Sequence, residues 1–173
     1  GDYTGWMLAV LDVLGLERAH LVGHHTGAAI GLQMASDAPD SVASLSMIGP
    51  NPLTAAEREA MAARFGQPFR PPRSGAYLLQ NWEYLRVGGA DRAVGLLHAE
   101  MIDMLRAWAA RPHAYEAVWR QDFAALFARL ARPALILSAP DDILFPYFQR
   151  AREMRPDIPA IILNGGATFQ PEI

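Results

Sequence analysis

The sequence lacks several features, and each absence excludes a class of protein or of site. It has no cysteine among its 173 residues, which excludes disulfide bonds, thiol nucleophiles and thiolate metal ligands. Its net charge of −3, without a polybasic segment, gives no reason to expect nucleic acid or a membrane surface as a partner. No apolar run approaches the roughly 20 residues that span a bilayer. The expected partner is therefore a small, apolar or neutral molecule.

What is present suits strands that alternate with helices around one core, since 51% of the residues are hydrophobic. Short apolar runs bounded by turn residues predict four strands, at residues 20–23, 42–48, 134–138 and 160–163. A helix with small residues is expected over 28–38 and another over 146–154. This order predicts a mostly parallel sheet flanked by helices.

Residues 54–130 have a different character, because they are rich in helix-favouring residues and aromatics and show little strand-like alternation. Thr54 and Glu57 have the spacing of a capping box at the start of one helix. Asp91 is placed to cap a second helix that runs to Ala110, and a third helix is expected over 113–130. The pattern predicts an all-helical insertion between two strands.

A sharp turn is predicted where the first strand meets its helix, at Gly23-His24-His25-Thr26-Gly27. This has the outline of a nucleophile elbow, G-x-S-x-G, with His25 where serine is usual. Gly23 and Gly27 are both expected to be necessary, because strand and helix would approach too closely for a Cβ atom at either place.

Three segments together resemble the α/β-hydrolase superfamily in order and spacing. Residues 13–27 are similar to its elbow stretch, and residues 132–146 to the strand that ends in the acid of its catalytic triad. Residues 159–169 are similar to the last strand and the turn that carries the catalytic histidine. The resemblance implies an α/β protein with a partial α/β-hydrolase fold.

The resemblance also implies a division of the chain, with a core at 1–50 and 131–173 and a helical cap at 51–130. Family members usually have several strands before the elbow, so the sequence is expected to be a fragment that lacks the N-terminal strands. The expected localisation is cytoplasmic.

In the family, a serine attacks a carbonyl, a histidine takes its proton and a carboxylate orients that histidine. Transferred by position, Asp142 is the acid, and the backbone N–H of Thr26 is the oxyanion donor. His25 stands at the serine position and Thr168 at the histidine position, so two of the three catalytic positions are altered.

Three readings of His25 stay open. It is a nucleophile or general base, since imidazole titrates near neutral pH, or it is a relic that fills a ligand pocket. In the third reading, Thr26 becomes the nucleophile. Thr168 is either a hydrogen-bond donor or an ordinary turn residue.

Substrate contacts are expected from His24 beside the elbow and from the cap residues Trp82, Trp108 and Trp119. His24, His25 and the Asp141-Asp142 pair have the chemistry of metal ligands, but adjacent histidines on a sharp turn are expected to point apart. We therefore expect no metal and no cofactor.

The sequence predicts a hydrolase with a non-standard site that acts on a small apolar ester, lactone or related carbonyl compound. The alternative is a catalytically inactive homologue that binds such a ligand. Oligomeric state is not readable from these patterns.

Overall fold

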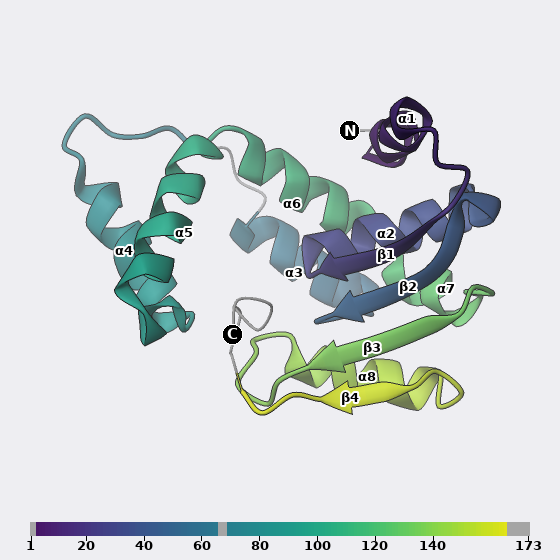
Figure 1. The fold of residues 1–173 in the computed structure, drawn as a ribbon. Coiled ribbons are helices and arrows are strands. Elements are labelled where there is room, and N and C mark those ends of the chain that lie inside the picture. Colours follow the sequence, from purple (N-terminus) through teal and green to yellow (C-terminus); the bar gives the residue numbers. More distant parts are fainter. Residues whose placement is uncertain (1–2, 66–68, 166–173) are drawn as a thin grey trace.

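Four parallel strands form one sheet in a computed structural model that describes residues 3–65 and 69–165. In sheet order they are β1 (Ala19–His24), β2 (Val42–Ile48), β3 (Ala134–Ser138) and β4 (Ala160–Ile162) (Figure 1). Because the strands run in one direction, their carboxyl ends meet at one edge of the sheet. Segments that follow β1, β2 and β3 are therefore neighbours in space.

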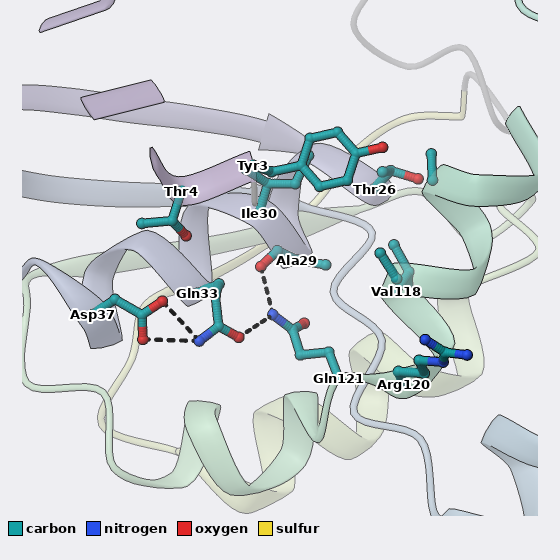
Figure 2. A pocket seen from close by; sticks show the side chains of 12 residues that line it. Tyr3, Thr4, Thr26, Ala29, Ile30, Gln33, Asp37, Val118, Arg120 and Gln121 are labelled. Carbon is teal, nitrogen blue, oxygen red and sulfur yellow. Dashed lines mark hydrogen bonds between the residues drawn. The ribbon is translucent and has the colours of Figure 1, made fainter. Parts of the chain in front are cut away.

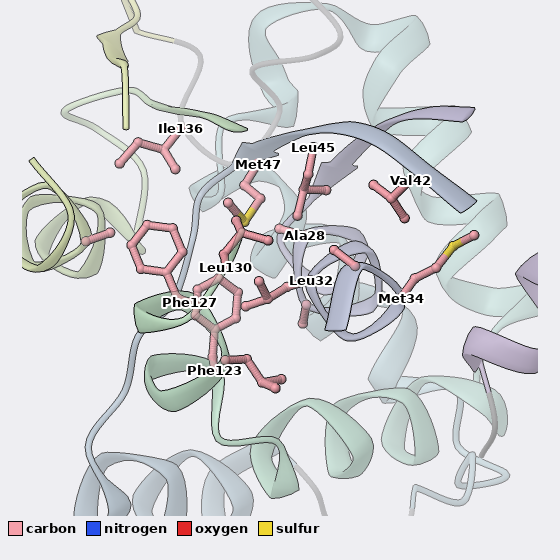
Figure 3. Packing of buried hydrophobic residues seen from close by; sticks show 14 of the residues in the cluster. Ala28, Leu32, Met34, Val42, Leu45, Met47, Phe123, Phe127, Leu130 and Ile136 are labelled. Atoms are coloured by element: carbon pink, nitrogen blue, oxygen red, sulfur yellow. The ribbon is translucent and has the colours of Figure 1, made fainter. Parts of the chain in front are cut away.

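Three helices bury one face of this sheet, namely α2 (Thr26–Asp37), α7 (Phe123–Ala128) and α8 (Phe145–Met154). Leu45 and Met47 of β2 pack there against Leu32 and Phe127 (Figure 3). A Cβ atom on Gly31 would lie 2.7 Å from the side chain of Leu45. The small residues of α2 thus let the helix lie close to the sheet, as the sequence predicted.

The chain between β2 and β3 is helical within the described residues. It contains α3 (Ala55–Phe65), α4 (Ala76–Val87), the short 3-10 helix η2 (Ala90–Arg92), α5 (Val94–Arg106), α6 (Ala110–Arg120) and α7. A second hydrophobic cluster of Leu85, Ala90 and Leu97 joins α4 and α5, which stand apart from the sheet (Figure 1). Val118 of α6 instead belongs to the core beneath the sheet.

The remaining elements are α1 (Tyr3–Leu14), which packs against α2, and the 3-10 helix η1 (Pro39–Ser41) before β2. Among the described residues, no helix is both long and apolar enough to cross a membrane.

The strand predictions are confirmed, and two helix predictions are wrong. Asp91 does not cap α5, because it lies in η2 and Ala93 precedes the helix. The helix expected over 113–130 is two helices, α6 and α7, because the backbone becomes extended at Gln121. Asp122 then caps α7 by accepting a hydrogen bond of 3.0 Å from Ala125 N. Thr54 and Glu57 form the predicted capping box, with Thr54 N donating to Glu57 Oε2 at 2.7 Å.

Candidate active site

The turn between β1 and α2 has the backbone of an elbow. His25 has φ 48° and ψ −103°, and it is the only residue other than glycine with positive φ in the described parts of the chain. Its N–H donates to the carbonyl of Ile48 at 2.9 Å, which ties the turn to the end of β2. A non-glycine residue in such a conformation persists only where its surroundings hold it, and such positions cluster at functional sites.

The two glycines of the turn are not equivalent. A Cβ atom on Gly23 would overlap the backbone of Gly27 and Ala28, so strand and helix do approach too closely there. A Cβ atom on Gly27 would meet nothing within 4 Å, and Gly27 does not have positive φ. The prediction that Gly27 is sterically necessary is therefore wrong, because its Cα faces open space.

His25 and Asp142 are brought together at the carboxyl edge of the sheet, where they follow the parallel strands β1 and β3. His25 Nε2 lies 3.0 Å from Asp142 Oδ2, although the two residues are 117 positions apart. The Asp142 side chain is fully buried, whereas that of His25 is 19% exposed. The pair is a histidine–carboxylate dyad whose imidazole still reaches solvent.

Backbone and neighbouring side chains fix the Asp142 carboxylate. Leu144 N donates to Oδ1 at 2.8 Å, and Ser138 Oγ donates a longer hydrogen bond of 3.5 Å to Oδ2. Gly49 has φ +64°, and a Cβ atom there would lie 2.7 Å from His25 Nε2 and 3.3 Å from Asp142 Oδ2. Because Gly49 has no side chain, His25 and Asp142 have room to contact each other.

Sequence reasoning missed both Gly49 and Ser138. A usable signal for Gly49 is its place directly after β2, which neighbours the elbow strand in a parallel sheet. Ser138 carried no signal, because a serine at the end of a buried strand is unremarkable until its neighbours are known.

The N–H of Thr26 occupies the first position of α2, where helical N–H groups have no partner within the helix. The partial positive charge of the helix N-terminus is directed to the same place. This position suits a donor to a developing oxyanion.

His24 lies against His25, with ring centroids 4.0 Å apart and planes inclined by 32°. The expectation that the two side chains point apart is therefore wrong, because the unusual backbone of His25 turns its ring back over its neighbour. Burial, and then the nearby His25, lowers the pKa of His24 from 6.5 to about 4. His24 is thus neutral near pH 7, and its Nε2 is buried without a partner among the described residues.

His24, His25 and Asp142 could each offer one metal-ligand atom, and these atoms lie within 4.8 Å of one another. Ligating imidazoles must direct their lone pairs at a common point. The two rings are instead tilted by 32° with centroids 4.0 Å apart, and His25 Nε2 already contacts Asp142, so we propose no metal ion here.

The other predicted site residues are scattered. Trp82 packs edge-on to His98 at 5.4 Å between ring centroids, Trp108 lines a separate cavity in the helical insertion, and Trp119 packs against the core. The structure therefore does not gather the three tryptophans at the dyad. Thr168 lies outside the described residues.

A cavity of about 380 Å³ adjoins the elbow between α1, α2 and α6 (Figure 2). Thr26 lines it beside the end of β1, and Gln121 reaches into it from the end of α6. Gln121 Nε2 donates to the carbonyl of Ala29 at 2.9 Å and to Gln33 Oε1 at 3.0 Å. These bonds join α6 to α2 next to the turn.

Comparisons with known proteins agree with this architecture. A family model described as the alpha/beta hydrolase fold matches residues 2–82. The protein of Pseudomonas savastanoi pv. phaseolicola named "Putative carbamate hydrolase RutD" is 30% identical over 92% of this chain and 64% of its own length. A second protein of that name, from Pseudomonas syringae pv. syringae, is 29% identical, and the chain covers 60% of it. The chain thus spans less than two thirds of these relatives.

Solved structures show the same fold. E-2-(acetamidomethylene)succinate hydrolase superposes with a TM-score of 0.68 at 22% identity, over 99% of this chain and 67% of its own. The enol-lactonase from Burkholderia xenovorans LB400 gives 0.67 at 21% identity, over 98% of this chain and 66% of its own. The parallel sheet, the elbow and these matches show that the chain has an α/β-hydrolase fold.

Proposed function

We propose that this chain is part of a hydrolase that cleaves a small, apolar ester, lactone or related carbonyl compound, with a histidine–aspartate dyad in place of a serine triad. The observation that carries the proposal is the 3.0 Å contact between His25 Nε2 and the buried carboxylate of Asp142. A carboxylate so placed orients an imidazole and stabilises its protonated form.

The dyad supports catalysis by a general base. With Nε2–H donating to Asp142, the other ring nitrogen, Nδ1, is the acceptor. A water molecule attacks the carbonyl carbon while Nδ1 takes one of its protons. The N–H of Thr26 donates to the carbonyl oxygen as negative charge develops. The proton then passes from Nδ1 to the leaving-group atom as its bond to the carbonyl carbon breaks, which yields the acid and the free leaving group.

The substrate class follows from the surroundings and from the relatives. The protein is slightly acidic overall, with a net charge of −3. A neutral carbonyl compound therefore suits this site better than a polyanion. Relatives and structural neighbours named as a carbamate hydrolase and an enol-lactonase also act, by those names, on carbonyl compounds. Within this proposal, residues 51–130 form the cap over the site.

A catalytically inactive ligand-binding homologue is the second candidate. It is favoured by the identity of the elbow residue, since an imidazole at position 25 leaves no hydroxyl or thiol at the apex of the turn. In that case the cavity beside Thr26 would hold a ligand that is not turned over.

The test is hydrolysis of phenyl acetate and δ-valerolactone, followed by acid release at constant pH. We expect His25→Gln and Asp142→Asn to lower turnover by about 10²- to 10⁴-fold, the range of general-base contributions. The control is His113→Gln, because His113 is exposed on α6 and remote in sequence from the elbow. Unchanged turnover in His25→Gln would refute the dyad, and saturable binding without turnover in the starting protein would favour the inactive homologue.

A further inference from the structure

A second cavity lies entirely among the helices between β2 and β3. Its volume is about 370 Å³, within the range of about 300–1,000 Å³ typical of small-molecule sites. Its lining includes four aromatic side chains and two arginines, namely Phe65, Phe69, Tyr77, Trp108, Arg64 and Arg111. None of its lining residues belongs to the dyad or to the cavity beside Thr26.

The two arginines give this cavity a positive charge that nothing described neutralises. No aspartate or glutamate lines the cavity. Within residues 3–65 and 69–165, neither Arg64 nor Arg111 forms a salt bridge, whereas neighbouring arginines do. Arg86 pairs with Glu83 at 2.7 Å, and Arg106 with Asp103 at 3.8 Å. Charge complementarity therefore points to an anionic ligand.

Aromatic rings hold both guanidinium groups without neutralising them. The Cζ atom of Arg111 lies 5.6 Å from the ring centroid of Tyr84 and 5.7 Å from that of Tyr115. The Cζ atom of Arg64 lies 4.9 Å from the ring of Phe65. Stacking of this kind limits the freedom of a long side chain before a ligand arrives, so less entropy is lost on binding.

We propose that this cavity binds an aromatic carboxylate. The ring of the ligand would pack between Trp108 and the phenylalanines, which supply the apolar lining, and its carboxylate would face Arg111 and Arg64. The planar fork of a guanidinium matches a carboxylate through two parallel hydrogen bonds. This site is separate from the dyad, so the inference does not depend on the proposed hydrolase activity.

A matched pair of probes tests the inference on the purified protein. 2-Naphthoate and 2-naphthamide share one ring system, and only the first is an anion, so titration calorimetry with each isolates the carboxylate. We expect the carboxylate to bind with one site per chain and at least about tenfold more tightly than the amide. Arg111→Gln should lower naphthoate affinity about tenfold and change naphthamide affinity little. Trp108→Leu should weaken both probes.

Arg106→Gln is the control, since Arg106 lies on α5 near this cavity but does not line it, and its side chain is 80% exposed. Its naphthoate affinity should equal that of the starting protein. Equal affinity for the two probes, no loss of naphthoate binding in Arg111→Gln, or an equal loss in Arg106→Gln would each overturn the inference. Circular dichroism of each variant separates lost binding from lost folding.

Discussion

At the scale of single residues, the turn before α2 depends on Gly23 more than on Gly27. Gly23→Ala would place a methyl group against the backbone of Gly27, and we expect it to lower the free energy of unfolding by about 2 kcal/mol, as other overpacked sites do. Gly27→Ala enters open space near the start of a helix and should be neutral or stabilising by up to about 1 kcal/mol. Urea unfolding of both variants measures the difference, and equal effects would contradict the close approach at Gly23.

His24 makes the stability of the protein depend on pH in a defined window. Its pKa is about 4 in the folded protein against 6.5 for a free side chain, so the unfolded chain binds the proton more readily. The resulting stability is complete above pH 6.5 and is lost as the pH falls towards 4. At about 1.4 kcal/mol per pKa unit, the loss is at most about 4 kcal/mol.

His24→Asn should flatten this part of the stability profile, because asparagine does not titrate. Thermal unfolding between pH 4 and 7 measures it, with His113→Gln as the control, since His113 is exposed. The same slope in His24→Asn and in the starting protein would show that another group causes the loss.

At the scale of elements, one ion pair joins the start of the helical insertion to the core. Glu57 completes the capping box of α3 and also contacts Arg150 of α8, with Arg150 Nη1 and Nη2 at 2.6 and 2.9 Å from its two carboxylate oxygens. Arg150 Nη1 also donates to the carbonyl of Pro52 at 3.0 Å. The carboxylate of Glu57 thus links α3 to α8, although Glu57 and Arg150 are 93 residues apart in the sequence.

The hydrogen bonds from Arg150, followed by that from Thr54 N, lower the pKa of Glu57 from 4.5 to about 2. The pair therefore stabilises the fold fully above pH 4.5 and loses this contribution as the pH falls towards 2. Because both side chains are about a third exposed, we expect Glu57→Gln to cost about 1 kcal/mol or less at neutral pH. Hydrogen exchange of the first turn of α3 should also become faster.

Glu59→Gln is the matched control for this prediction, because Glu59 lies on the same helix, is exposed and forms no ion pair within the described residues. It should change neither the unfolding transition nor the exchange of α3. An equal change in both variants would assign the effect to net charge and not to the contact with Arg150.

The elements that sequence reasoning predicted well are those with a strong local pattern. The apolar runs of β2 and β3 have the predicted bounds, because short apolar runs between turn residues mark buried strands. Thr54 with Glu57 caps α3 as predicted, because a capping box joins residues only three positions apart. The break between α6 and α7 was missed because Gln121 leaves the helix to bond α2, 92 residues earlier in the chain. A contact of that range leaves no trace in helical periodicity.

The candidate site likewise has one part that the sequence predicts and another part that it does not. Strand order placed His25 near Asp142, since both follow strands of one parallel sheet. The contact of His24 with His25 could not be predicted, because it depends on where the His25 ring lies, which the positive φ of His25 and the space left by Gly49 allow. Both are properties of the assembled turn.

At the scale of the whole molecule, the helical insertion between β2 and β3 contacts the loop that carries Asp142. Arg92 of η2 donates to Asp141 at 3.0 Å, and Asp141 directly precedes the buried Asp142. The loop that carries the acid is therefore held both by the core strand β3 and by the helical insertion.

The assembled site predicts how the protein responds to a serine-directed reagent. No serine stands at the elbow, so a fluorophosphonate probe should not label the elbow peptide, and any ester turnover should survive the probe. His25→Ser alone, or Thr168→His alone, should gain little, because triad members act as a unit. The double variant restores nucleophile and base together and should become labelled. Mass spectrometry of the elbow peptide reads the outcome, and stoichiometric labelling of the unmodified protein, or turnover abolished by the probe, would mean that the nucleophile lies elsewhere.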